Sequence, residues 1–243
     1  VFKELREQGI HPKRYGIRMD SGDLAYLSKK VKAALDAEGF TDAIISASND
    51  LDENLIGSLK EQGATINSWG VGTNLITSKD CPAFGGVYKL AAIWSETEQR
   101  FLPKIKISEN AEKITNPGDK KVYRIYDLQG MIIADLIALA DEQFSANEPL
   151  LLFDPIETWK KTLLPGGSYR MKELLVPVFE KGSCVYESPK VMDIRQHCKE
   201  ELATLWEESK RFEYPHQTYV DLSRKLWNVK TGLLEQYQTG VSE

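Results

Sequence analysis

Charged and small polar residues gather in one stretch near the start of the chain. Residues 15–23 read Y-G-I-R-M-D-S-G-D, so an apolar run typical of a buried strand is followed by four polar or small residues. Arg18 lies inside the apolar run, and its planar guanidinium suits a carboxylate or a phosphate. Because α/β sheets and barrels keep their reacting groups at the carboxyl ends of their strands, this stretch indicates a ligand site.

Two later strand endings have the same character. Residues 48–53 read S-N-D-L-D-E and residues 69–74 read W-G-V-G-T-N, and each segment follows an apolar run. Neighbouring parallel strands have their carboxyl ends at one edge of the sheet, so we expect the three endings to form a common rim. The candidate site residues on this rim are Arg18, Asp20, Ser21, Gly22, Asn49, Asp50, Gly70, Gly72 and Thr73.

The residue types on this rim suit a phosphate and a sugar. Gly72 and Thr73 would leave backbone N–H groups accessible to a phosphate, with the dipole of a following helix favouring the anion. Asp20 and Asp50 could bind ribose hydroxyls or Mg²⁺, which prefers one or two carboxylates together with the phosphates of its substrate. Asp20 is the candidate magnesium ligand.

Helix capping is the alternative explanation for several of these residues. Residues 20–23 could cap a helix that begins near Leu24, and Asp52 could cap the next helix, because Ser and Asp side chains satisfy free backbone N–H groups. A G-x-G-T segment is also common in turns. Capping does not explain Arg18 within an apolar strand, nor why three successive strands end in polar and small residues.

The elements that position the rim follow an alternating order. Apolar runs predict strands at 15–19, 43–47, 65–71 and 86–94. Leu24, Leu27, Val31 and Leu35 recur at helical spacing, and a similar pattern ends at Gly63. Such short connections imply parallel pairing with right-handed crossovers. Three or four units are too few for an eight-stranded barrel, so the sheet is open or its remaining strands lie outside this chain.

The chain is expected to have three parts with different patterns. Residues 1–95 are predicted to form a partial α/β barrel that carries the rim. Residues 96–185 alternate and contain turn signals, which predicts a β-rich region with strands at 104–108, 121–127, 131–135, 150–153 and 174–179. Residues 186–243 show apolar stripes at 191–205 and 219–233, which predict C-terminal helices.

Composition limits the classes of partner. The 243 residues are 42% apolar and 28% charged, with a net charge of −5, which argues against nucleic acid or an anionic membrane as main partner. Three cysteines without a C-x-x-C pair favour a reducing cytoplasm over a disulfide framework. No apolar run reaches the roughly 18 residues of a membrane helix. The chain starts without Met in a helical pattern, so we expect it to begin inside a larger protein.

The combined motifs resemble one enzyme family. The order Y-G-I-R-M-D-S-G-D-L, I-S-A-S-N-D-L-D-E, W-G-V-G-T-N-L-I-T and G-G-V-Y-K-L over residues 15–90 is similar to the second half of nicotinate phosphoribosyltransferases. The later K-I-S-E-N-A-E-K-I-T-N-P-G-D-K-K-V-Y-R resembles the same family. Several motifs in the right order are far more specific than any one of them.

The resemblance implies an activity and a set of roles. Members of this family make nicotinate mononucleotide and pyrophosphate from nicotinate and phosphoribosyl pyrophosphate, coupled to ATP hydrolysis, in NAD salvage. Arg18 would lie beside nicotinate, Asp20 and Ser21 on the ribose and magnesium side of the donor, and Asn49 and Asp50 near ribose and phosphate. The 5′-phosphate would be cradled by Gly70, Gly72 and Thr73. The implied fold is an incomplete TIM-like α/β barrel followed by a mixed β-sheet and a helical C-terminal region.

Part of the family pattern is absent from this chain. The family's phosphorylated histidine and the aromatic residues that sandwich nicotinate belong to its N-terminal half, and His11, His197 and His216 do not match that histidine. The chain is therefore expected to be incomplete as a catalyst and to form a homodimer or associate with an N-terminal half. A nicotinamide or quinolinate phosphoribosyltransferase and a non-catalytic truncated or split subunit are the alternatives.

The sequence does not decide the role of one basic segment. Lys106, Lys113, Lys120 and Arg124 surround the turn N-P-G at 116–118. They could bind ATP or pyrophosphate, or they could simply face water.

Overall fold

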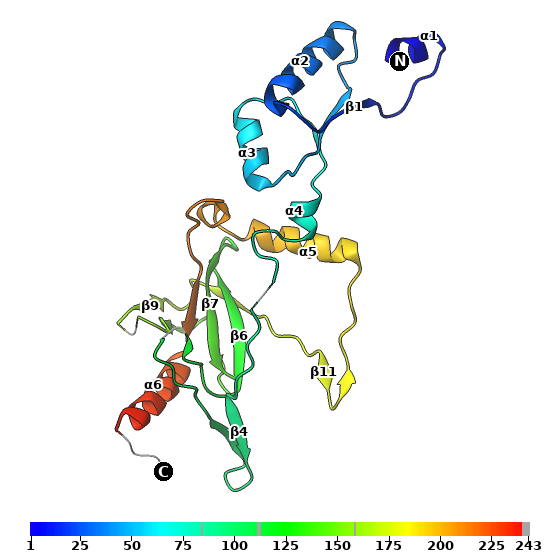
Figure 1. Cartoon of the computed structure of the whole chain (residues 1–243). Coiled ribbons are helices and arrows are strands. Elements are labelled where there is room, and N and C mark those ends of the chain that lie inside the picture. The colour runs from blue at the N-terminus through cyan, green and yellow to red at the C-terminus, as the bar shows by residue number, and fades with distance from the viewer. Residues whose placement is uncertain (84, 111–112, 158, 240–243) are drawn as a thin grey trace. The chain divides into compact units, whose positions relative to one another are not determined.

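The computed structural model describes residues 1–83, 85–110, 113–157 and 159–239. The chain divides into two compact units, Val1–Gly86 and Val87–Glu243 (Figure 1). The elements of the first unit are α1 (Phe2–Glu7), β1 (Gly16–Met19), α2 (Leu24–Ala37), β2 (Ile44–Ala47), α3 (Glu53–Glu61), β3 (Ser68–Trp69) and α4 (Thr73–Ile76).

The first unit is built on a parallel sheet in the order β1-β2-β3. Arg18 pairs with Ser46 in the register of β1 and β2, and Ala47 pairs with Trp69 in that of β2 and β3. The predicted alternation of strands and helices with parallel pairing is confirmed here, because α2 and α3 each connect two neighbouring strands.

The apolar face of α2 forms much of the core of this unit. Leu24 is buried, and Leu27, Val31 and Leu35 pack against a buried cluster that includes Ile45. The helix ends before Gly39, whose φ of +76° lies in the left-handed region that glycine adopts without strain. The helical stripe predicted from the sequence is therefore confirmed.

Two predicted strands of the first sheet are wrong in extent. The strand expected at 65–71 is reduced to β3, because the side-chain oxygen of Asn67 accepts the hydrogen bond from the Ile45 amide in place of a backbone carbonyl. The strand expected at 86–94 does not join this sheet. A crossover between parallel strands usually contains a full helix, whereas α4, which follows β3, has only four residues. The apolar side chains there, such as Tyr88, are exposed. Residues 92–95 pair instead with residues 100–103.

The second unit is rich in strands. They are β4 (Ala92–Ser95), β5 (Arg100–Pro103), β6 (Lys120–Tyr126), β7 (Ile132–Leu139), β8 (Leu150–Phe153), β9 (Lys161–Leu164), β10 (Arg170–Glu173), β11 (Phe179–Glu180), β12 (Ser183–Cys184) and β13 (Tyr219–Leu222). Its helices are α5 (Val191–Ala203), the 3-10 helix η2 (Glu207–Lys210) and α6 (Arg224–Thr239).

A mixed six-stranded sheet organises this unit in the order β10-β6-β7-β13-β8-β9. Figure 1 shows β6 and β7 side by side as its long hairpin, and β13 is parallel to β7. Strand β7 alternates buried and half-buried side chains, and Leu136 is fully buried in the core. A mixed α/β fold with a multi-stranded sheet is thus confirmed.

Several predicted elements of the second unit are wrong. Residues 104–108 and 174–178 form no strand, and β4 pairs instead with β5 in an antiparallel hairpin. The helical stripe expected at 219–233 begins with a strand, because β13 fills the gap between β7 and β8. The helix follows only after Ser223, whose hydroxyl accepts a hydrogen bond from the Leu226 amide. In the described part of the chain, no helix is both long and apolar enough to cross a membrane.

We predict that Asp221→Asn stabilises the second unit at neutral pH. Asp221 is only 5% exposed, and burial, with a smaller effect of the Asp154 carboxylate, raises its pKa above the ordinary 3.8. As pH rises through 3.8 the unfolded chain loses this proton first, so stability falls until the pH passes the raised pKa. The free energy of unfolding of the variant should exceed that of the parent by about 1 kcal/mol at pH 7, and this difference should disappear below pH 4.

Urea unfolding followed by tryptophan fluorescence measures this difference, because Trp94, Trp159, Trp206 and Trp227 all belong to the second unit. The exposed Glu213 gives a control, since Glu213→Gln makes the same carboxyl-to-amide change without a burial effect. An Asp221→Asn variant less stable than the parent at pH 7 would contradict the prediction.

Candidate functional site

The carboxyl ends of the three parallel strands lie side by side in the first unit. The Ser48 amide donates to the Met19 carbonyl at 3.0 Å, and the Gly70 amide donates to the Ala47 carbonyl at 2.8 Å. These bonds continue the sheet ladder beyond the strand ends. Residues 18–23, 48–52 and 70–74 therefore form one edge, which we call the strand-end rim.

Arg18 joins the first two segments of the rim. Its Nε donates to the Ser48 hydroxyl at 2.8 Å, and a terminal nitrogen lies 3.4 Å from the Asp20 carboxylate. The Arg18 side chain is 65% exposed, so the ion pair with Asp20 contributes little to stability. The geometry leaves the guanidinium accessible to a ligand and holds its direction through Ser48.

Helix capping is carried out by residues next to the candidate ligands. The Asp23 carboxylate accepts a hydrogen bond from the Tyr26 amide at 2.9 Å and caps α2. The Asp52 carboxylate accepts one from the Leu55 amide at 2.7 Å and caps α3. The capping function proposed for Asp52 is therefore confirmed, whereas Asp20 and Ser21 cap neither helix. Both are exposed at the rim.

Glycine has a conformational role at Gly22. Its φ of +79° is in the left-handed region, and a Cβ there would lie 3.1 Å from a methyl group of Leu27. Gly22 thus lets the chain turn from β1 into α2 and keeps Asp20 and Ser21 at the strand end.

The second segment of the rim presents Asn49 and Asp50. Both residues are exposed, and Asp50 has a φ of +40°, which non-glycine residues adopt only rarely. The side-chain nitrogen of Asn74 donates to the carbonyls of Asp50 and Leu51 at 2.8 and 3.1 Å. The backbone conformation of this segment is therefore held by a residue of the third segment.

The third segment brings small residues to the rim. A Cβ on Gly70 would lie 3.1 Å from the Ser48 Cβ, which makes bulk at this position unfavourable. Gly72 precedes α4, and a Cβ there would meet no atom within 4 Å, so the space beside Gly72 and Thr73 is open. Because α4 has only four residues, its dipole is small, and phosphate binding here would depend on individual N–H groups.

Within the described residues, the side chains alone do not form a metal site. In residues 1–83, 85–110, 113–157 and 159–239, no group of three His, Cys, Asp or Glu side chains is arranged to hold a metal ion. The exposed Asp20 carboxylate fits a Mg²⁺ ion that takes most of its ligands from phosphate and water. Its role as a magnesium ligand stays a prediction.

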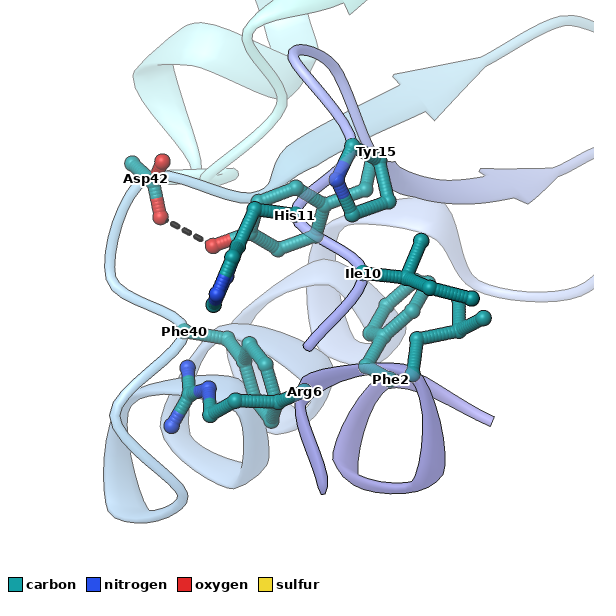
Figure 2. A pocket seen from close by; sticks show the side chains of 9 residues that line it. Phe2, Arg6, Ile10, His11, Tyr15, Phe40 and Asp42 are labelled. Atoms are coloured by element: carbon teal, nitrogen blue, oxygen red, sulfur yellow. Dashed lines mark hydrogen bonds between the residues drawn. The ribbon is translucent and has the colours of Figure 1, made fainter. Parts of the chain in front are cut away.

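The first unit also has a pocket of about 250 Å³, which lies at the amino ends of the strands, opposite the strand-end rim. It is lined partly by Tyr15 and Asp42, which precede β1 and β2, and Figure 2 shows the hydrogen bond between them. The Arg6 guanidinium stacks 4.1 Å from the centre of the Phe40 ring. His11 also lines this pocket, which separates it from the strand-end rim.

The basic segment near N-P-G has structural partners in the second unit. Arg124 binds the Asp135 carboxylate with two hydrogen bonds of 2.8 and 3.0 Å. Lys120 donates to the Gly118 carbonyl, and the Asn116 side chain accepts a hydrogen bond from Lys230 at 2.9 Å. These contacts favour a structural explanation for Lys120 and Arg124.

All nine candidate residues thus lie on one rim, while their chemical roles stay predictions. Asn74, which directly follows G-V-G-T, was not among the residues predicted from the sequence. The type of residue was a signal, because an Asn side chain offers two N–H donors that can bridge neighbouring carbonyls.

The chain is similar in sequence to known proteins. Residues 119–230 match the family model described as nicotinate phosphoribosyltransferase C-terminal domain. A nicotinate phosphoribosyltransferase of Bacillus subtilis is 46% identical over 100% of this chain and 49% of its own length. The one of Caenorhabditis elegans is 36% identical over 87% of this chain and 38% of its own length.

The fold also has a counterpart of known structure. A crystal structure of human nicotinic acid phosphoribosyltransferase matches with a TM-score of 0.67 and 24% identity, over 90% of this chain and 40% of that one. At this identity the match concerns the fold alone. The chain spans about half or less of the length of these relatives.

The family model and the relatives show that the chain is similar to phosphoribosyltransferases. More particularly, the chain corresponds to the C-terminal half of the nicotinate phosphoribosyltransferase family. The resemblance indicated by the motifs in residues 15–90 is confirmed, since the relative from Bacillus subtilis aligns over the whole chain.

Proposed function

We propose that this chain supplies the phosphoribosyl-donor part of a nicotinate phosphoribosyltransferase. The reaction would form nicotinate mononucleotide and pyrophosphate from nicotinate and phosphoribosyl pyrophosphate, in NAD salvage. The observation that carries this proposal is the strand-end rim, which gathers an arginine, carboxylates and glycines, with open space beside Gly72, in a chain 46% identical to an enzyme of that name.

Each segment of the rim has a proposed role. Arg18 would lie beside the carboxylate or ring of nicotinate, because its exposed fork suits a carboxylate. Asp20 and Ser21, which cap no helix, would bind the ribose and magnesium side of the donor. Asn49 and Asp50 would lie near ribose and phosphate. The remaining glycines and hydroxyl, Gly70, Gly72 and Thr73, would surround the 5′-phosphate.

The proposed reaction needs no covalent bond between the protein and the substrate. The pyridine nitrogen of nicotinate would attack the anomeric carbon while the bond to pyrophosphate breaks, through a transition state with oxocarbenium character. Positive charge on the sugar and negative charge on the leaving group both need stabilisation, so positioning and electrostatics supply most of the catalysis. The carboxylates of the first two segments of the rim would stabilise the positive charge on the sugar. The backbone N–H groups of the third segment would bind the negatively charged phosphate.

We further propose that Mg²⁺ and ATP take part. Asp20 would provide one carboxylate to Mg²⁺, whose positive charge would help to neutralise pyrophosphate. Coupling to ATP through a phosphorylated histidine would use residues of the family that this chain does not span, since the resemblance gives His11, His197 and His216 no such role. Complete activity would therefore require the other half of the family's length.

The first unit is also proposed to be part of an incomplete TIM-like barrel. Its three parallel strands are connected by α2 and α3, as in a barrel, and β1 and β3 are the edges of the sheet. A cytoplasmic location is proposed from the three cysteines, Cys81, Cys184 and Cys198, which are free and exposed.

A test of the donor site is titration with phosphoribosyl pyrophosphate and Mg²⁺ by calorimetry. We expect Asp20→Ala and Gly72→Val to weaken binding at least tenfold, because one removes a carboxylate and the other fills the open space beside the phosphate. The matched controls Asp36→Ala and Gly57→Val lie away from the rim, and Gly57 also has open space around it. Unchanged affinity in both rim variants would contradict the site assignment.

An exposed arm of the second unit supports a homodimer. Every residue from Leu175 to Glu200 is exposed, although this segment contains the β11-β12 hairpin and most of α5. Its large apolar side chains are Leu175, Val176, Val178, Phe179, Val185, Tyr186, Val191, Met192 and Ile194. Ordered apolar surface of this kind marks a protein–protein contact, and we propose that it packs against a second copy of the chain.

Sedimentation analysis of the chain tests the homodimer. We expect a dimer in the parent chain and a shift toward monomer in Val191→Glu, because a carboxylate in the contact would be desolvated. Leu128→Glu is the control, since Leu128 is 51% exposed but lies outside the arm. A stable parent monomer would contradict the proposal.

A further inference from the structure

Asn74 connects two segments of the strand-end rim. Its side-chain nitrogen donates to the Asp50 carbonyl at 2.8 Å and to the Leu51 carbonyl at 3.1 Å. An amide nitrogen has two hydrogens, so these two bonds use its full donor capacity. Asn74 belongs to the first turn of α4, whereas both acceptors belong to the segment after β2, more than 20 residues earlier.

The accepting segment has a conformation that needs such support. Asp50 has a φ of +40°, and a non-glycine residue keeps this conformation only where its surroundings fix it. On one side the chain is anchored by Leu51, which is 1% exposed in the core. The Asn74 side chain binds the carbonyls of Asp50 and of Leu51. The buried Leu51 side chain and Asn74 therefore together fix the backbone that carries the Asn49 and Asp50 side chains.

The same contact fixes the third segment. A four-residue helix such as α4 is not stable by itself, so its position depends on contacts beyond its own backbone. Asn74 supplies two of these contacts and directly follows Gly72 and Thr73. With the bond from Arg18 to Ser48, the three segments are joined in series by two side chains.

We propose that Asn74 is a positioning residue that holds the second and third segments of the rim in the arrangement that binds the phosphate and ribose of a phosphoribosyl donor. Asn74 would act through the backbone of Asp50 and Leu51, with its own donors already used within the protein. This inference rests on the proposed function of the rim for the identity of the ligand.

The experiment compares Asn74→Leu with a matched variant of the same sheet. Leu keeps the size of Asn and removes both donors without adding charge. Asn67→Leu is the control, because the Asn67 side chain also bonds a backbone group of the β2 segment, the Ile45 amide at 2.9 Å, away from the rim. Binding of phosphoribosyl pyrophosphate with Mg²⁺ and amide hydrogen exchange are measured for both variants and the parent.

We expect Asn74→Leu to weaken donor binding at least tenfold and to accelerate exchange at residues 49–52 and 72–76. Asn67→Leu should keep donor affinity within about twofold of the parent, even where it lowers stability. If Asn74→Leu does not fold by circular dichroism, Asn74→Ala replaces it in the same comparison.

Parent-like affinity in the Asn74 variant, or an equal loss in the Asn67 variant, would overturn the inference while leaving the proposed function intact. Failure of the parent chain to bind the donor would instead count against the proposed function. In that case hydrogen exchange still decides whether Asn74 holds the two segments. Exchange at residues 49–52 of the Asn74→Leu variant that is unchanged from the parent would overturn the positioning role of Asn74.

Discussion

Parallel backbone pairing of β1, β2 and β3 is the interaction on which the candidate site depends. The ladder places three strand ends at one edge, and two more backbone bonds, from Ser48 to Met19 and from Gly70 to Ala47, carry the order into the loops. A change of register by one residue would turn Arg18 from the rim toward the core. The chemistry of the rim is therefore a consequence of strand register and buried residues such as Ile45.

The polar residues of the rim differ in their contacts within the protein. Asp23 and Asp52 accept hydrogen bonds from backbone N–H groups of the helices that they cap. Asp20, which lies three residues before Asp23, caps no helix and is exposed. Neighbouring residues of one type thus have different roles, which are set by their position relative to the first helical turn. The two side chains that bridge the segments, Arg18 and Asn74, hold this arrangement with few contacts.

The sequence predicted those features that depend on local patterns. The helical stripe from Leu24 and the cap at Asp52 follow from spacing and residue type, and the family resemblance followed from several motifs in order. It did not predict β13, because Tyr219 and Leu222 also fit a helical period and only the gap between β7 and β8 decides for a strand. The sequence showed that Asn74 has two N–H donors, but it did not show which carbonyls accept them, because these lie more than 20 residues away.

We propose that the three strand ends bind the phosphoribosyl donor together. Backbone amide NMR of the isotope-labelled chain, titrated with phosphoribosyl pyrophosphate and Mg²⁺, tests it most directly. We expect the largest shifts at residues 18–22, 48–51 and 70–74, and we expect these shifts to saturate together. Shifts centred on the pocket of Tyr15 and Asp42, or on the second unit, would contradict the proposal.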